Sequence, residues 1–275
     1  MESLRLMEKR KWNLQKIGLN KMKKFFAFLL LLSISTIVFG WGQTGHRAIA
    51  KIAQNNLSKK AIKELHKIMG DESLVEASTW MDEIKSDSTY NYARRWHYVT
   101  VPSGKTYETS EKNETGDAFE AVIRLKEIVK NVNSTLLQKR EAIRMLVHIV
   151  GDMHQPLHVG NGQDKGGNSI KIKWFNKYSN LHKIWDSGII DSKGLSYSEL
   201  AEIIDHSKNG DRNFNSTNMD DWISEAQALR PQIYSTAGKK NLSYNYIYQN
   251  WDTVKDQLLK GGIRLANVLN ELLGS

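Results

Sequence analysis

The stretch that decides the fold is Leu146–His158, which reads LVHIVGDMHQPLH and sets His and Asp side chains among apolar residues. His148 and Asp152 lie four residues apart, so in a helix both side chains leave one face, one turn apart. Pro156 cannot lie in a helix interior, and it should end the helix and let the chain swing His158 back toward the same point. Imidazole and carboxylate ligands together suit zinc. The stretch therefore predicts a helix that carries a zinc site.

A second pair with the same spacing lies downstream, in the segment His182–Asp186, which reads HKIWD. One such pair is weak support for a metal site, because a lone His on a helix is usually a surface residue or a hydrogen-bonded core residue. Two pairs, with an additional His beside the first, are much harder to explain in that way. The residues alone thus favour a metal centre built from both segments.

The first forty residues have the layout of a secretory signal and are not expected to belong to the fold. Met22 is a better start than Met1, and Met22-Lys-Lys24 forms a short basic region after residues 1–21. Phe25–Phe39 is an almost unbroken apolar run, and Gly40 is a small residue suited to cleavage. The run is short for a transmembrane helix, although an uncleaved membrane anchor is the alternative. We therefore expect a secreted or periplasmic protein whose domain is residues 41–275, with no stable membrane anchor after cleavage.

The net charge of the mature chain is small. Residues 1–40 contain eight of the 39 Lys and Arg residues and two of the 30 Asp and Glu residues. Residues 41–275 therefore carry 31 basic against 28 acidic side chains, a net charge of +3 rather than +9. Bulk charge gives no indication of nucleic-acid binding, so affinity for a polyanion must come from a local site. The sequence has no cysteine, which leaves His, Asp, Glu, the backbone or a free amine as metal ligands.

The hydrophobic pattern predicts a single domain that is all-α apart from one small β-hairpin. Residues 94–102 and 169–175 alternate as strands do, and the glycine-rich residues 161–168 are best explained as a hairpin turn. Thr44 and Asp117 are expected to cap the helices that follow them. Helices are predicted over residues 45–55, 59–69, 75–84, 117–132, 136–151, 181–190, 200–206, 219–229 and 252–273.

Cleavage after Gly40 would give the new terminus a chemical role. The mature chain opens with Trp41-Gly-Gln-Thr-Gly-His46. A free α-amine forms a five-membered chelate with the carbonyl of its own residue, and His46 is near enough in sequence to join it. The simpler alternative is that Trp41 only fills the core.

The motifs, taken in order, resemble the S1/P1 nuclease family, the zinc-dependent single-strand nucleases and 3′-nucleotidases of fungi, plants and bacteria. The resemblance covers the whole mature chain, and it implies a mainly helical fold that holds three zinc ions in a cleft. The motifs are Trp41-Gly-x-x-Gly-His46, Trp80-x-Asp82, Trp96-His97-Tyr98, the His148, Asp152 and His158 set, Asp164-x-Gly-Gly-Asn168, His182-x-x-x-Asp186 and Arg264-Leu-Ala266.

The resemblance assigns the zinc ligands, with Asp152 as a bridge between the first two ions. His66, His154 and His206 are left as structural or surface residues. The first ion is held by Trp41, His46 and Asp152, the second by Asp82, His97, His148 and Asp152, and the third by His158, His182 and Asp186.

The resemblance also implies roles in binding and catalysis. Lys85 and Asn168 match positions that contact phosphate, and Tyr98 matches an aromatic residue that stacks on a base. Asp82 and Asp152 would act in catalysis beside them, Asp82 by orienting the attacking water or accepting its proton. The implied activity is hydrolysis of single-stranded RNA and DNA to 5′-phosphate products, together with 3′-nucleotidase activity, by a monomer.

Two departures from the fungal pattern stand out. The fungal members carry disulfides and this chain has no cysteine, which suits a bacterial member. The fungal members have an Asp that holds a base edge where this chain has Thr100, so the base preference is open.

Two alternatives come from other classes of protein. Bacterial zinc phospholipase C has a similar metal site, but its gap after the terminal Trp is longer and its last pair ends in Glu, so residues 41–46 and 182–186 favour the nuclease. A zinc-storage protein without enzymatic activity would not need Lys85, Tyr98 and Asn168 in place.

Overall fold

Helices make up most of the structure, as the sequence predicts. The computed structural model describes residues 40–206, 214–235 and 239–274, which belong to one compact unit. The predicted signal segment, residues 22–39, lies outside these residues. Within them, no helix is long and apolar enough to cross a membrane. The longer helices are α2 (Gln43–Asn55), α3 (Lys59–Met69), α6 (Ala118–Lys130), α7 (Leu136–Met153), α10 (Tyr197–His206), α11 (Met219–Ser235) and α12 (Tyr244–Leu273).

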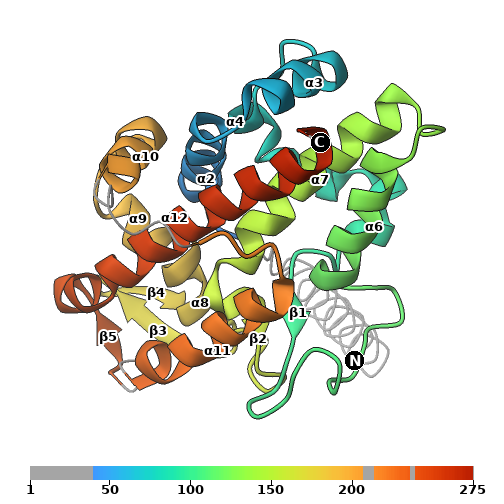
Figure 1. The fold of residues 1–275 in the computed structure, drawn as a ribbon. Coiled ribbons are helices and arrows are strands. Elements are labelled where there is room, and N and C mark those ends of the chain that lie inside the picture. The colour runs from blue at the N-terminus through green and yellow to red at the C-terminus, as the bar shows by residue number, and fades with distance from the viewer. Residues whose placement is uncertain (1–39, 207–213, 236–238, 275) are drawn as a thin grey trace, which may run out of the picture. The chain divides into compact units, whose positions relative to one another are not determined.

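The long helix α12 runs through the middle of the fold, with α2 and α7 packed against it (Figure 1). It begins at Tyr244 rather than at residue 252, because its apolar face continues through the buried residues Tyr246 and Ile247. Its close approach to α2 depends on Gly262, since a Cβ there would lie only 2.5 Å from Ile52 Cβ. α7 and α2, which carry candidate ligands, are therefore anchored on the same central helix.

α7 ends where the sequence predicts. Thr135 and Gln138 form a capping box at its start. The helix stops at Met153, and Pro156 opens a short 3-10 helix that ends at His158. The proline thus turns the chain back immediately after the helix.

The predicted strand 94–102 is real over two residues only. Strand β1 (Val99–Thr100) pairs in parallel with β2 (Val159–Gly160), which directly follows His158. The pairing brings the segment after His97 beside the segment after His158, although the two lie far apart in sequence.

The predicted helix 75–84 is divided into α4 (Leu74–Ala77) and α5 (Trp80–Glu83). At the break, Ser78 Oγ donates to a carbonyl of the preceding turn at 2.7 Å, a local bond that competes with the helical pattern. The carbonyl of Ser78 lies 2.7 Å from His148 Nδ1 and accepts its hydrogen bond. The break therefore supplies a hydrogen-bond acceptor to a candidate ligand on α7.

A small hairpin is present, but its turn is not where the glycines predict it. Strands β3 (Lys171–Trp174) and β4 (Lys177–Asn180) are antiparallel and joined at Phe175 and Asn176. These two residues have φ of 48° and 66°, the backbone that two-residue hairpin turns require. Residues 161–168 instead form the loop between β2 and β3. A third strand, β5 (Asn241–Leu242), pairs in parallel with β3.

One of the two predicted helix caps is wrong. Gly42, not Thr44, is the N-cap of α2, and its amide donates to the carbonyl of Asp186 at 2.7 Å. A contact with a distant segment, rather than a hydroxyl, fixes the start of this helix. Asp117 caps α6 as predicted, because its carboxylate accepts hydrogen bonds from Phe119 N and Glu120 N.

The predicted helix 181–190 contains an irregular centre. It consists of α8 (Leu181–Lys183), a π-helical turn over Ile184–Gly188 and α9 (Ile189–Asp191). Single π-helical turns occur frequently at functional sites, and this one carries Asp186. Sequence periodicity does not reveal it, because one extra residue in a turn hardly changes the apolar pattern.

Candidate metal centre

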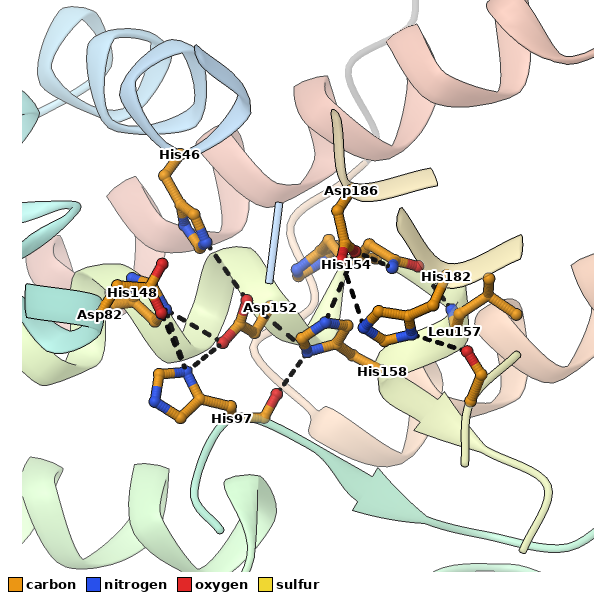
Figure 2. Close-up of polar contacts among 12 residues, drawn as sticks. His46, Asp82, His97, His148, Asp152, His154, Leu157, His158, His182 and Asp186 are labelled. Carbon is orange, nitrogen blue, oxygen red and sulfur yellow. Dashed lines mark hydrogen bonds and ion pairs between the residues drawn. The ribbon is translucent and has the colours of Figure 1, made fainter. Parts of the chain in front are cut away.

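Three groups of His and Asp side chains converge on one region, and all of them are buried except the half-buried Asp82 (Figure 2). They come from α2, α5, α7, the 3-10 helix after α7, the segment before β1, and the helix that follows β4. The groups are His46 with Asp82 and His148, His97 with His148 and Asp152, and His158 with His182 and Asp186. All the implied side-chain ligands are thus brought together, but the first group combines His46 with Asp82 and His148, whereas the resemblance pairs His46 with Asp152.

One set of side chains, which we call the paired group, has the dimensions of a zinc site. It consists of Asp82, His97, His148 and Asp152. His97 Nδ1 lies 3.1 Å from His148 Nε2 and 3.0 Å from Asp152 Oδ2, and the last two atoms are 3.2 Å apart. Asp82 Oδ1 lies 3.6 Å from His148 Nε2 and 4.0 Å from His97 Nδ1. Four ligand atoms about 2.0–2.1 Å from a tetrahedral zinc ion lie about 3.3–3.4 Å from one another. The four side chains therefore fit around one ion.

The local electrostatics favour a cation at this point. Burial lowers the pKa of His97 to about 4, so its ring is neutral and its Nδ1 faces the nitrogen of another imidazole. Burial also opposes protonation of His148, yet the carboxylates of Asp152 and Asp82 raise its pKa overall. Two imidazole nitrogens and two carboxylates that converge on one point are best satisfied by a metal ion.

Asp152 has the geometry of a bridge. Burial alone would raise its pKa, but the surrounding imidazoles lower it well below its usual range, so the carboxylate is ionised. Its Oδ2 faces His97 and His148, whereas its Oδ1 lies 3.2 Å from His46 Nε2. The two oxygens are therefore turned toward different ligand sets.

The third group is held by backbone and amide hydrogen bonds. The Nδ1 atoms of His158 and His182 lie 2.6 Å from the carbonyls of His97 and Gly166, which leaves each Nε2 facing Asp186. Asp186 Oδ1 is 3.8 Å from His158 Nε2, and its Oδ2 is 3.3 Å from His182 Nε2. Burial raises the pKa of Asp186 well above its usual range, and a bound cation would relieve this cost.

Sequence reasoning missed Gln155. This fully buried residue donates from Nε2 to Asp186 Oδ1 at 2.5 Å and accepts from Leu157 N at 2.6 Å. It thereby fixes the orientation of the carboxylate. The only indication in the sequence is a polar amide inside an otherwise apolar stretch next to Pro156.

The backbone at Trp41 lies next to the paired group. Trp41 is fully buried, so its side chain does fill the core. A Cβ added to Gly40 would overlap Asp152 Oδ1 and would lie 2.9 Å from His46 Nε2. The residue that precedes Trp41 therefore lies against both His46 and Asp152, with no room for a side chain.

The residues predicted to bind substrate are not among the three ligand groups. Lys85 Nζ forms an ion pair with Asp82 Oδ1 and is therefore part of the site. Tyr98 is half-buried and follows His97 in the chain, while Thr100 is exposed on β1. Asn168 is half-buried, and its Nδ2 donates to the carbonyl of Lys165 at 3.0 Å.

His154 lies outside the three groups, as the family resemblance implies. It is buried, its Nδ1 lies 2.7 Å from the carbonyl of Val150, and its Nε2 accepts from Arg264 Nη1 at 3.2 Å. His66 is exposed and lies 2.9 Å from the carbonyl of Gly70. The side chain of His206 is outside the described part of the chain.

Comparison with known proteins supports the same family as the sequence motifs. A family model described as S1/P1 Nuclease matches residues 41–274. Endonuclease 2 of Arabidopsis thaliana is 30% identical over 278 residues, which span 89% of this chain and 94% of the relative. Nuclease P1 of Penicillium citrinum is 28% identical over 267 residues, which span 86% of this chain and 98% of the relative. Nuclease S1 of Aspergillus oryzae is 28% identical over 178 residues, which span 61% of this chain and 60% of the relative. These relatives favour a nuclease over phospholipase C.

Proposed function

The chain belongs to the S1/P1 nuclease family of trinuclear zinc enzymes that hydrolyse single-stranded nucleic acids and 3′-nucleotides, and we propose which of its residues carry this activity. The observation that supports the proposal is the convergence of three buried His and Asp groups with spacings that fit zinc. We assign Trp41, His46 and Asp152 to the first ion, Asp82, His97, His148 and Asp152 to the second, and His158, His182 and Asp186 to the third.

Bound zinc supplies Lewis acidity and lowers the pKa of a water toward neutrality. Asp82, which belongs to the paired group, orients the attacking water and accepts its proton. The water oxygen forms a bond to phosphorus while the bond from phosphorus to the 3′-oxygen breaks. The departing 3′-oxygen takes a proton from solvent, so the products are a 5′-phosphate and a 3′-hydroxyl. Lys85 and Asn168 balance the charge that develops on the phosphoryl oxygens.

Tyr98 provides the preference for single strands. A base that is not paired in a duplex can stack on an aromatic ring, and such stacking tolerates different bases. Because Thr100 stands where fungal relatives have an acidic residue, we propose that this chain reads the base edge weakly and accepts several bases.

The mature enzyme begins at Trp41. The signal layout of residues 22–40 and the start of the family match at residue 41 both support cleavage after Gly40. Cleavage would free the Trp41 amine and remove Gly40, which lies against His46 and Asp152. The product would be a secreted or periplasmic monomer with no membrane anchor.

The proposal is tested with purified residues 41–275 against single-stranded DNA, single-stranded RNA, 3′-AMP and phosphatidylcholine, each with and without a chelator. We expect hydrolysis of the nucleic acids and of 3′-AMP, loss of that activity with chelator, and no hydrolysis of the lipid. Hydrolysis of phosphatidylcholine alone would overturn the proposed function.

A further inference from the structure

A buried arginine holds together two short strands near the metal centre. Arg230 lies on α11 and is 7% exposed. Its Nη2 donates to the carbonyls of Val101, Val159 and Gly160 at 2.8, 2.6 and 3.0 Å. Among the described residues it makes no ion pair with a carboxylate, and its buried Nη1 has no hydrogen-bond partner. Burying a charge in this way is costly, so its position calls for an explanation.

The strands that Arg230 joins are weak by themselves. β1 and β2 contain two residues each and pair in parallel, supported by Val101 N donating to Gly160 O at 2.9 Å. Parallel pairs are slightly less stable than antiparallel ones, and a sheet of two short strands is marginal. Figure 1 shows α11 beside this pair. A single nitrogen of Arg230 thus bridges the carbonyl of Val101, the residue after β1, to the carbonyls of both residues of β2.

Each strand positions a candidate zinc ligand of a different group. His97 lies two residues before the start of β1 and belongs to the paired group, whereas His158 directly precedes β2 and belongs to the third group. The two are joined by the contact of 2.6 Å between His158 Nδ1 and the carbonyl of His97 (Figure 2). The register of β1 against β2 therefore sets how far the third group lies from the paired group.

We propose that Arg230 is a positioning residue that keeps the third zinc group in place relative to the paired group by tying β1 to β2. The proposal rests on the ligand assignment given under the proposed function. The paired group has three ligands on α5 and α7, which do not depend on this strand pair. The third group depends on it more, because the anchor of His158 is the carbonyl of His97.

The test compares zinc release and catalysis in Arg230→Met, Arg230→Lys and Arg140→Met. Met keeps an unbranched apolar stem without the donors of Arg, and Lys keeps the charge on a less branched side chain. Arg140 is the matched control, because its Nε also donates to a backbone carbonyl, that of Ile68 at 3.0 Å, but on α3 away from the centre. The readouts are zinc content during timed exposure to a chelator, kcat and KM on single-stranded DNA, and the thermal midpoint.

Loss of a residue that orients metal ligands typically lowers metal affinity or activity by about 10–100-fold. We expect Arg230→Met to release one of its three zinc ions about tenfold faster than wild type, to lose kcat by a similar factor and to keep its KM. Arg230→Lys should lie between Met and wild type, and Arg140→Met should lose thermal stability only.

The proposal is overturned if Arg230→Met releases zinc at the wild-type rate while its thermal midpoint falls as in Arg140→Met, since Arg230 would then be a structural residue only. If Arg230→Met does not fold, zinc release from Arg230→Lys decides, and a wild-type rate again overturns the proposal. A wild-type protein that binds no zinc would contradict the proposed function instead, and the two failures are therefore distinct.

Discussion

At the scale of single residues, Asp152 has contacts that no other candidate ligand shares. Its two carboxylate oxygens face separate ligand sets, His97 and His148 on one side and His46 on the other. Each of the other side-chain ligands either faces one ligand set only or offers a single coordinating atom. In the proposed assignment this carboxylate would neutralise two cations at once, which is a different task from completing one coordination sphere.

We expect Asp152→Asn to be more damaging than a substitution at a ligand of one ion. The amide keeps the shape but loses the negative charge, so kcat should fall by more than about 100-fold. The comparison is His182→Ala, measured with the same DNA substrate and with zinc analysis of both proteins. An active Asp152→Asn beside an inactive His182→Ala would show that the paired site is assigned wrongly.

Tyr98 tests the binding of the base at the same scale. A base stacked on an aromatic ring contributes roughly 1–3 kcal/mol, and the stack should stabilise bound substrate and transition state alike. Tyr98→Ala should therefore raise KM by roughly 5–150-fold with little change in kcat, whereas Tyr98→Phe should behave like wild type. An unchanged KM with a collapsed kcat would contradict the role of Tyr98 as a stacking platform.

At the scale of secondary-structure elements, α11 and α12 are joined by a partly buried ion-pair network. Arg264 Nη2 lies 2.6 Å from Glu225 Oε1, and Lys260 Nζ lies 2.9 Å from its Oε2. Arg264 also donates to His154, which follows α7. Partial burial opposes ionisation of Glu225, but the hydrogen bonds from Arg264 and Lys260 lower its pKa to about 2.

This network predicts a pH-dependent contribution to stability. The pKa of Glu225 in the folded state is below its ordinary value of 4.5, so the stabilisation is fully present above that pH and is lost as the pH falls toward 2. Glu225→Gln should cost about 1 kcal/mol at pH 7, a modest value because the carboxylate is 33% exposed and screened by solvent.

The measurement is urea unfolding of wild type and Glu225→Gln between pH 7 and pH 3, with Glu271→Gln on the surface as control. The difference in unfolding free energy should shrink as the pH falls for Glu225 and stay small throughout for Glu271, which is 42% exposed in its ion pair with Lys126. A difference that grows in acid would show that the pKa of Glu225 is not depressed.

The elements also show what the sequence can predict. Helix α7, its end before Pro156 and the ligand pair on it follow from local spacing, so they are predicted well. The break at Ser78 and the start of α2 at Gly42 depend on contacts with distant segments and are not predicted. Gln155 and Arg230 were missed for the same reason, since their partners lie 31 and up to 129 residues away.

At the scale of the whole molecule, the candidate ligands join segments from α2 to the π-helical turn after α8. Ions held by residues so far apart in sequence act as cross-links, and their binding free energy becomes folding free energy. Activity and stability should therefore be lost together when the metal is removed. This link concerns the whole fold, because α7 and α2 both pack on α12.

We expect chelation to abolish hydrolysis of single-stranded DNA and to lower the thermal midpoint by several degrees at least, with both recovered on adding zinc. At 100 times its dissociation constant, a single bound ligand already contributes about 2.7 kcal/mol. Thermal unfolding and metal analysis of the same samples measure both effects. An active preparation with fewer than two zinc ions per chain would contradict the expectation.

The N-terminus gives the last prediction, which concerns the chain as a processed whole. The Trp41 amine can ligate zinc only when no residue precedes it, because a peptide nitrogen is planar and has no usable lone pair. Gly40 also lies against His46 and Asp152, because a Cβ there would overlap Asp152 Oδ1. A chain that retains even one residue before Trp41 should then hold the first ion by His46 and Asp152 alone, too few ligands for a stable zinc site.

Two chains that differ by one residue test this directly. Residues 41–275 released by a protease should be active and bind three zinc ions, whereas residues 40–275 should bind about one ion fewer and have a kcat lower by about 100-fold. The thermal midpoint of the two zinc-free proteins should be equal, because Trp41 fills the core in either case. Equal zinc content and equal activity would show that the terminus is not a ligand. The proposed connection between signal cleavage and catalysis would then be lost, while the assignment of the other two ions would stand.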